Sequence, residues 1–288
     1  MNILITGCNG LVGETLSKEL NKNSSLNLYG LGRTDKGHIN TIVLDLNTNW
    51  SENQLPQKID IIIHLAQSEK FREFPESSLE VFNVNTISTL KLLDYARKAG
   101  ASKFIYASSG GIYGNSNVGF NEDDLVVNKK DLGFYLGSKF CSEIIAENYN
   151  TFFDIIILRF FFVYGKEQKS SMLIPRLLNN ILQEKEIVIQ GNDGIKINPV
   201  HVDDASKAII KCLDIKGSHK INIAGPDVLS LREICEIIGT KIDKKPIFKA
   251  QDTEPKHLFG DIAKMQKLLI KPEIKFAEGI NELIEKYA

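Results

Sequence analysis

The sequence predicts an α/β fold with a doubly wound parallel sheet and a smaller C-terminal lobe. Short apolar runs rich in β-branched residues alternate with amphipathic helical patterns through the first half of the chain, which is typical of βαβ units. A glycine-rich turn follows the first run at Gly7, and after Gly165 the alternation loosens into shorter, mixed elements.

The sheet strands are predicted from runs of isoleucine, leucine, valine and phenylalanine, with helices between them. These runs cover residues 2–6, 26–31, 41–45, 60–65, 103–107 and 153–161. A long helix is predicted over 79–99, because Val81, Val84, Leu90 and Leu93 follow a helical period and Gly100 ends the pattern.

The second half of the chain predicts helices over 172–183, 203–213 and 230–238, with short strands at 187–189 and 220–223. No proline-rich linker, repeat or low-complexity segment separates the halves. We therefore expect a nucleotide-binding domain over 1–165 and a smaller substrate lobe over 166–288, interleaved with the first. The substrate is expected in a cleft between them.

Composition excludes several classes of partner. Lysine and arginine total 35 against 36 acidic residues, a net charge of −1, so nothing suggests nucleic-acid or membrane binding. The apolar runs are too short to span a bilayer and the N-terminus lacks the basic region of a signal peptide, so a cytoplasmic protein is expected. Four cysteines are scattered without a metal or disulfide spacing: Cys8, Cys141, Cys212 and Cys235.

The first strand leads into a turn with glycines at Gly7, Gly10 and Gly13, and a helical pattern follows. In that context the glycines let the backbone approach a pyrophosphate at a helix N-terminus, as in a Rossmann-type dinucleotide site. An ordinary glycine-rich turn is the alternative. Cys8 could have a lowered pKa at this helix N-terminus, or could simply be a small residue beside the cofactor.

The second strand ends at Arg33 without an acidic residue. An acidic residue there favours NAD, whereas an arginine accommodates the 2′-phosphate of NADP, so Arg33 favours NADP(H) over NAD(H). Asp35 could still reach the ribose, and Arg33 could be a solvated surface residue. Asp45, with Leu46, is expected beside the adenine, although a turn would also explain the aspartate.

Tyr135 and Lys139 lie four residues apart on a predicted helix. Their side chains share one face, so a phenol and an ammonium can meet one substrate. A cation beside a phenol favours the phenolate, which predicts a lowered pKa for Tyr135. The pair therefore indicates acid–base chemistry beside a nucleotide cofactor.

With these features the chain resembles, over nearly its whole length, the extended short-chain dehydrogenase/reductase family. Its NAD-dependent epimerase/dehydratase group acts mostly on nucleotide sugars. Beyond the glycine turn and the Tyr135–Lys139 pair, the resemblance lies in His64-Leu65-Ala66-Gln67, Asn83-Val84-Asn85 and Ser109-Gly110-Gly111-Ile112-Tyr113-Gly114.

The resemblance implies a role for each catalytic residue. Tyr135 exchanges a proton with a carbinol or carbonyl oxygen, Ser109 hydrogen-bonds that oxygen, and Lys139 holds the nicotinamide ribose. Ser108 points to the other face of its strand and is expected to make structural hydrogen bonds. Helix packing, a surface cation and a turn hydroxyl are the structural alternatives for Tyr135, Lys139 and Ser109.

The predicted binding residues follow from the same resemblance. The cofactor contacts are Gly7, Asn9, Gly10, Leu11, Val12, Gly13, Arg33, Asp45, Leu46, Leu65, Ala66, Gln67, Asn85, Tyr135, Lys139 and Phe162. The substrate contacts are Ser109, Tyr113, Arg176 and Lys196.

The chain departs from the family at three places. Gly110 and Gly111 stand where dehydratases carry an acidic pair, which argues against dehydration. Phe162 replaces an asparagine that often binds the sugar diphosphate, and Ile197 replaces an arginine that often clamps it. Other cations could serve instead, or the substrate is not a standard nucleotide sugar. The cations in question are Lys166, Arg176, Lys196 and Lys256, and each could equally be a solvated surface residue.

The resulting expectation is an NAD(P)(H)-dependent enzyme that transfers hydride at a ring carbon, C4, of a nucleotide-linked sugar, by keto-reduction or epimerisation. Its alternatives are an NADP-binding regulatory protein of the same fold and a reductase of a non-nucleotide carbonyl compound. A homodimer through 79–99 and 135–150 is expected, which the mass in solution would test. His201, Asp203 and Asp204 suggest a metal, but an aspartate capping a helix explains them, so no metal is expected.

Overall fold

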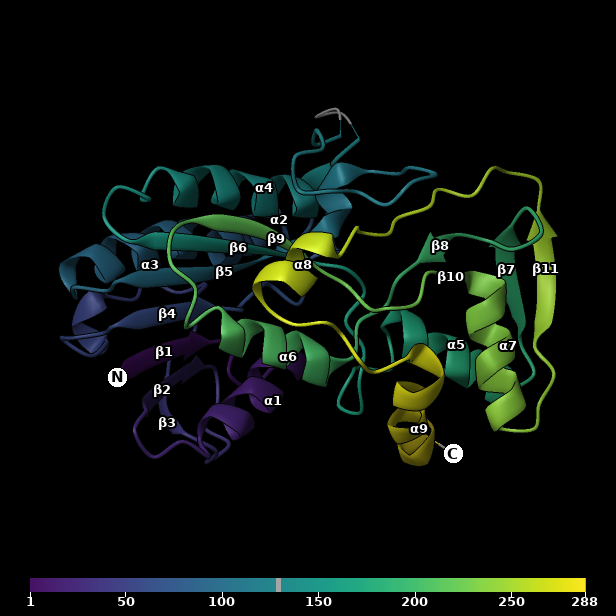
Figure 1. Ribbon diagram of the computed structural model, residues 1–288, viewed down its shortest axis with the longest axis horizontal. Coiled ribbons are helices and arrows are strands. Elements are labelled where there is room, and N and C mark those ends of the chain that lie inside the picture. The colour runs from purple at the N-terminus through teal and green to yellow at the C-terminus, as the bar shows by residue number, and fades with distance from the viewer. Residues whose placement is uncertain (128–130, 288) are drawn as a thin grey trace. The chain divides into compact units, whose positions relative to one another are not determined.

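The computed structural model, which describes residues 1–127 and 131–287, contains a seven-stranded sheet with the strand order β3-β2-β1-β4-β5-β6-β9. In Figure 1 the labelled strands can be followed in this order from β6 through β5, β4, β1 and β2 to β3. The strands are β1 (Asn2–Thr6), β2 (Asn27–Gly32), β3 (Asn40–Val43), β4 (Ile61–His64), β5 (Lys103–Ser109), β6 (Asp154–Phe160) and β9 (His219–Ile223).

The pairing confirms the predicted α/β sheet. Strand β1 runs parallel to both β2 and β4, β2 parallel to β3, and β4 parallel to β5. The chain thus builds outward from β1 to β3 and then returns to continue at β4 on the other side. Ligands of open α/β sheets bind at such a switch point, outside the carboxyl ends of the strands.

Helices pack on this sheet through residues that alternate along each strand. Leu4, Ile62 and Tyr106 share one buried cluster with Leu92 of α3 and Ala146 of α4, because every second side chain of a strand points to the same face. The helices joined to this sheet are α1 (Leu11–Leu20), α2 (Ser78–Phe82), α3 (Ser88–Lys98), α4 (Gly133–Glu147) and α6 (Val202–Lys211). Short 3₁₀ turns occur at Glu52–Gln54 and Gly110–Tyr113.

The helix predicted over 79–99 is interrupted. Between α2 and α3 lies a π-helical turn, η2 (Asn83–Ile87). Its Asn85 carbonyl accepts hydrogen bonds from the hydroxyls of Thr89 (2.6 Å) and Ser142 (2.8 Å). Such turns add a residue to a helix and frequently lie at functional sites.

The chain forms two compact units, each assembled from separate stretches. The first comprises Met1–Ile112, Leu125–Arg159 and Ser206–Ile221, and the second comprises Tyr113–Asp124, Phe160–Ala205 and Asn222–Ala288. Across the part of the chain that the structure describes, none of the helices is both long and apolar enough to cross a membrane.

The second unit contains two small sheets, in which β7 pairs in parallel with β11 and β8 pairs antiparallel with β10. Helices α5, α7 and α9 supply much of its main apolar cluster. The predicted elements at 172–183, 187–189 and 230–238 are present, but the last three elements along the chain and both two-residue strands are additional. The bounds are α5 (Leu173–Leu182), β7 (Glu186–Gln190), β8 (Lys196–Ile197), β10 (Leu229–Ser230), α7 (Leu231–Lys241), β11 (Ile247–Gln251), α8 (Ala263–Leu268) and α9 (Phe276–Tyr287).

A buried histidine connects β1, β4 and α3 in the first unit. The His64 ring, 1% exposed, lies with Nδ1 2.6 Å from the Thr6 hydroxyl and Nε2 2.9 Å from the Thr89 hydroxyl. Burial, and next the charge of Lys139, lower the pKa of His64 to about 3. The ring therefore stays neutral in the folded protein at pH values where the same histidine in an unfolded chain is already protonated.

This difference predicts a pH-dependent loss of stability. Below pH ~6.5 His64 is protonated in the unfolded state, whereas in the folded protein it stays neutral down to about pH 3. The free energy of unfolding therefore decreases as the pH falls, by about 2 kcal/mol between pH 7.5 and 5.0. His64→Gln should show a smaller decrease in urea unfolding at the two pH values. His219→Gln, which changes a surface histidine bonded to the Lys216 carbonyl, should keep the full decrease. Equal slopes for both variants would contradict this account.

Candidate active site

The glycine turn after β1 is packed too tightly for side chains. Gly7 has a φ of +68°, and a Cβ there would lie 2.9 Å from the backbone nitrogen of Ala66. A Cβ on Gly13 would lie 2.1 Å from the Gly7 carbonyl oxygen. The turn therefore lies against the segment that follows β4, at the switch point of the sheet.

Helix α1 begins directly after this turn, with Gly10 as its N-cap, and no side chain among the residues that the structure describes caps it. The first N–H groups of a helix lack intrahelical partners and can bind a phosphate. The crowded glycines and the uncapped helix start fit the pyrophosphate of a dinucleotide.

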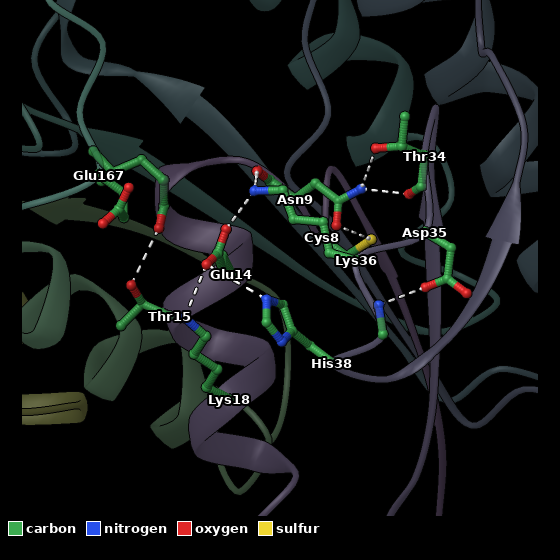
Figure 2. Close-up of polar contacts among 12 residues, drawn as sticks. Cys8, Asn9, Glu14, Thr15, Lys18, Thr34, Asp35, Lys36, His38 and Glu167 are labelled. Atoms are coloured by element: carbon green, nitrogen blue, oxygen red, sulfur yellow. Dashed lines mark hydrogen bonds and ion pairs between the residues drawn. The ribbon is translucent and has the colours of Figure 1, made fainter.

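Asn9 fastens the turn to the chain after β2, as Figure 2 shows. Its side-chain amide donates to the carbonyl of Thr34 at 2.5 Å and lies 3.3 Å from the Thr34 hydroxyl. The neighbouring Cys8 is 2% exposed, and burial raises the pKa of its thiol. The idea of a lowered pKa at Cys8 is therefore wrong, because burial outweighs any effect of the helix N-terminus.

Two cations stand on the segment after β2, and both are paired with carboxylates. The Arg33 guanidinium lies 3.1 Å from the Glu69 carboxylate, and both side chains are more than half exposed. The Lys36 ammonium lies 2.6 Å from the Glu14 carboxylate and 3.4 Å from the Asn9 carbonyl. Lys36 is absent from the residues predicted from the sequence, which include Arg33. Its place three residues after Arg33, on the same segment after β2, is the sequence feature that indicates it.

Glu14, in the first turn of α1, collects several positive partners (Figure 2). Lys18 lies 2.8 Å and His38 3.5 Å from its carboxylate, in addition to Lys36. Burial opposes ionisation, yet the hydrogen bonds from Lys18 and Lys36 lower the pKa of Glu14 to about 2. Glu14 is thus ionised at working pH and holds Lys36 over the turn.

The residues predicted beside the adenine lie after β3. Asp45 accepts the backbone N–H of Asn47 at 2.9 Å, as expected for a turn aspartate, and Leu46 is buried. Beside Leu46 a cavity of about 280 Å³ is lined also by Trp50, Ile87 and Lys91. Leu65 and Ala66 are half-buried after β4, where the glycine turn touches them.

Tyr135 and Lys139 lie on α4 as predicted, but their electrostatics differ from the expectation. The Tyr135 phenol donates to the side-chain carbonyl of Gln67 at 2.9 Å, and burial raises the pKa of Tyr135 to about 12. The Lys139 ammonium donates to the Ala107 carbonyl at 2.9 Å. The predicted lowering of the Tyr135 pKa is therefore wrong in this structure, since burial dominates and the ammonium is directed to β5.

Lys139 itself is 2% exposed, and burial lowers its pKa to about 7 although the charge of Glu143 opposes that shift. Glu143 lies one turn further along α4 and pairs with Arg159 of β6 at 2.7 Å, both side chains being buried. A buried ion pair thus lies next to the lysine in the core of the first unit.

Ser109 ends β5 and its hydroxyl accepts the backbone N–H of Gly111 at 3.1 Å. A Cβ on Gly111 would lie 2.9 Å from a methyl of Leu136, the neighbour of Tyr135, so this turn packs against α4. Ser108 is buried, but its hydroxyl has no hydrogen-bond partner within residues 1–127 and 131–287. The predicted structural hydrogen bonds of Ser108 are therefore wrong.

The Asn85 side chain is buried and makes its hydrogen bonds to other residues of the protein. It is 1% exposed; its side chain accepts the Ser68 backbone N–H at 3.0 Å and donates to the Ser138 hydroxyl at 3.0 Å. These bonds tie the loop after β4 to α4, so the structure favours a positioning role over the predicted cofactor contact.

Of the other predicted binding residues, Leu11 and Val12 lie in the first turn of α1, and the rest belong to the second unit. Tyr113 is 3% exposed, its phenol donates to Asn222 at 2.9 Å and its ring stacks on Phe120, which does not favour a substrate contact. Phe162 has a φ of +45° and packs against two apolar clusters. Ile197 is fully buried. The cations Lys166, Arg176, Lys196 and Lys256 are all exposed.

His201, Asp203 and Glu282 are spaced as metal ligands might be. Nδ1 of His201 accepts the Asp203 backbone N–H at 3.3 Å, and the buried Nε2 lies 3.8 Å from the Glu282 carboxylate. The Asp203 and Glu282 carboxylates face different ring nitrogens, at 3.7 and 3.8 Å, and Nε2 has no hydrogen-bond partner among the residues that the structure describes. Helix α6 starts at Val202, before both aspartates, so the predicted aspartate cap is wrong; Asp204 instead accepts the N–H groups of Glu273 and Ile274.

Comparison with known proteins agrees with this geometry. The NAD dependent epimerase/dehydratase family matches residues 3–224, so the chain belongs to this family of enzymes, within the extended short-chain dehydrogenases/reductases. It is 30% identical over 233 residues to the UDP-glucuronate 4-epimerase of Thermodesulfobacterium geofontis, covering 78% of this chain and 72% of the relative.

Two further similarities bear on the reaction. The chain is 28% identical over 246 residues to the dTDP-4-dehydro-6-deoxyglucose reductase of Escherichia coli, covering 79% of this chain and 74% of the relative. It also resembles the crystal structure of UDP-glucuronic acid 4-epimerase from Bacillus cereus in complex with UDP-glucuronic acid and NAD. The TM-score is 0.88 at 25% identity, over 99% of this chain and 98% of that chain.

The crowded glycine turn predicts a selective effect on nucleotide binding. Gly13→Ala places a methyl 2.1 Å from the Gly7 carbonyl and should weaken binding of both NADH and NADPH at least about tenfold, because the turn must move away from the phosphates. Gly137→Ala, where a Cβ meets nothing within 4 Å, is the matched control and should bind normally. Fluorescence titration measures both; unchanged affinity in Gly13→Ala would contradict the assignment of this turn.

Proposed function

We propose that the protein epimerises a nucleotide-linked sugar at C4 by hydride transfer, with NAD(P) as the hydride carrier. The observation that carries the proposal is the grouping of Tyr135 and Lys139 on α4 with Ala107 and Ser109 of β5, in the compact unit that also contains the glycine turn. When bound, the nicotinamide cofactor would supply the hydride chemistry, while the chain's own residues align the sugar and move the proton.

Each residue has a role set by its chemistry. Tyr135 exchanges its phenol proton with the oxygen on the reacting carbon, and Ser109 donates a hydrogen bond to the same oxygen. Lys139 is held at the edge of β5 by the Ala107 carbonyl, where its ammonium can bind a ribose hydroxyl. A group whose pKa burial brings to about 7 can hold or release a proton near neutral pH.

The choice of C4 and of a nucleotide sugar rests on the relatives. The Thermodesulfobacterium geofontis and Bacillus cereus proteins are both 4-epimerases of UDP-linked glucuronate, and the similarity to the latter spans 99% of this chain. Dehydration is disfavoured, because Gly110 and Gly111 stand where dehydratases carry carboxylates, and a side chain at Gly111 would require a Leu136 methyl 2.9 Å away to move.

The second candidate function is NADPH-dependent reduction of a keto sugar. Arg33 and Lys36 favour it, because they place two cations beside the turn where a 2′-phosphate would lie. The similarity to the dTDP-4-dehydro-6-deoxyglucose reductase is in keeping with such a reaction. An epimerase retains its nucleotide, whereas a reductase releases it oxidised, so the nucleotide freed by heating the purified protein distinguishes the two candidates.

The proposed catalytic role of Tyr135 predicts a loss of turnover without a loss of binding. Tyr135→Phe removes the exchangeable proton and should lower kcat by about 10²- to 10⁴-fold, while the affinity for NAD stays at the wild-type value. Epimerisation of UDP-glucuronic acid, followed by proton NMR of the sugar, measures the rate. Tyr149→Phe, just beyond the end of α4, is the control and should remain active; full activity in Tyr135→Phe would remove the catalytic claim.

The assignment of Arg33 to a 2′-phosphate predicts a change confined to one nucleotide. Arg33→Ala should weaken NADPH binding about tenfold or more, the worth of one charge-assisted hydrogen bond, and leave NADH binding unchanged. Arg97→Ala, which also breaks an exposed ion pair, should affect neither nucleotide. Equal losses for NADH and NADPH in Arg33→Ala would count against NADP preference.

A further inference from the structure

The contact between Tyr135 and Gln67 is unexpected for a residue predicted to touch the cofactor. The phenol oxygen of Tyr135 lies 2.9 Å from the side-chain oxygen of Gln67. The Phe71 ring lies against the same phenol, with ring centroids 4.9 Å apart. Both partners come from the segment after β4, so this segment forms one wall around the tyrosine.

Buried hydrogen bonds hold the backbone next to Gln67, although the Gln67 side chain itself is exposed. Its neighbour Ser68 donates its backbone N–H to Asn85 at 3.0 Å, and Asn85 donates to the Ser138 hydroxyl at 3.0 Å. Ser138 in turn donates to the Tyr135 carbonyl at 2.7 Å. Ser68, Asn85 and Ser138 are each at most 4% exposed. This chain of hydrogen bonds therefore links the residue next to Gln67 to the backbone of Tyr135, the residue that Gln67 contacts.

The chemistry of the contact depends on the protonation of the phenol. A phenol donates its one proton to an amide oxygen, whereas a phenolate facing the same oxygen would be repelled. The amide could instead turn and donate its N–H to a phenolate, which would stabilise the opposite form. The two orientations therefore predict opposite effects when the amide is removed.

Resting on the function proposed above, we infer that Gln67 is a positioning residue whose amide oxygen accepts the hydrogen bond of the Tyr135 phenol until the oxygen on the reacting sugar carbon takes its place. When the sugar carbonyl carbon gains the hydride that a reduced nicotinamide would supply, the phenol O–H bond breaks and the sugar O–H bond forms, leaving a phenolate. In the reverse direction the phenolate takes that proton back, and the phenol returns to Gln67. The contact thus favours the phenol before the sugar binds, the form from which keto-reduction starts, whereas an epimerisation, which begins by oxidising the sugar, requires the phenol to lose this proton first.

The other charged and titratable groups around the phenol are few among the residues that the structure describes. Lys139 lies one turn along α4 and 5.3 Å from the Tyr106 ring of β5, and Tyr106 itself interacts with the Tyr135 charge. The Arg72 guanidinium lies 4.9 Å from the centroid of Phe71. These groups stay constant in the variants below, so a shift between variants reports the amide.

The test measures ionisation of Tyr135 in the nucleotide-free full chain, by NMR of tyrosine labelled with ¹³C at Cζ, with Tyr135→Phe assigning the signal. Gln67→Met keeps the side chain's length without an acceptor and should lower the ionisation midpoint by about 0.7 pH unit, the worth of one hydrogen bond. Gln67→Glu keeps the acceptor, adds a negative charge and should raise the midpoint. Gln183→Met, at the exposed end of α5, should leave it unchanged.

A raised midpoint in Gln67→Met, or equal midpoints in all variants, would overturn the inference. Because no substrate is present, this result stands apart from the proposed function. If the Tyr135 ionisation midpoints of the variants follow the expected order but the protein leaves sugar nucleotides unchanged, the proposed function is refuted and the role of Gln67 beside Tyr135 stands. If the protein epimerises the sugar nucleotide but the ionisation midpoints of the variants do not follow the expected order, the proposed function stands and the role of Gln67 is removed.

Discussion

The arrangement of α4 depends on the side chain and carbonyl of one buried residue, Asn85. It joins the loop after β4, the π-helical turn and α4 through bonds to Ser68, Ser138 and Ser142. An amide can bridge these elements because it both donates and accepts, and a buried polar group left without partners would destabilise the fold. The widened turn at Asn83–Ile87 directs this amide inward, so a local irregularity of one helix sets the position of Tyr135 on another.

Function and stability oppose each other around Lys139. The unfolded chain binds a proton at this lysine more tightly than the folded protein, whose pKa burial lowers to about 7, so the folded state is weakened at neutral pH. The effect is complete below pH ~7 and fades as pH rises toward ~10.4, the pKa of an unperturbed lysine. Glu143, bonded to Arg159, partly offsets it. The core thus tolerates an unfavourable ammonium where a cofactor ribose would require one.

Much of the first unit could be predicted from its sequence, because β-branched runs, helical periodicity and crowded glycines are local signals. The sheet strands lie within two residues of the expected ends, and Gly7 and Gly13 are as confined as the turn requires. The contact of Gln67 with Tyr135 spans 68 positions and no local pattern encodes it. Burial likewise reversed the expected Tyr135 pKa, since desolvation depends on tertiary packing. Strand β11 is mostly exposed and exists through pairing with β7, which periodicity does not report.

The cations beside the glycine turn have a consequence for how a nucleotide arrives. Arg33 pairs with Glu69 at 3.1 Å and Lys36 with Glu14 at 2.6 Å, and Glu14 is shared with Lys18, so the carboxylates offset part of the field of these cations. The whole chain is also close to neutral, with a net charge of −1. Long-range attraction of a polyanion requires an uncompensated field that extends beyond the screening length. A nucleotide of the kind proposed above would then be encountered mainly by diffusion and orientation, and a 2′-phosphate on it would have to compete with the two glutamates after contact.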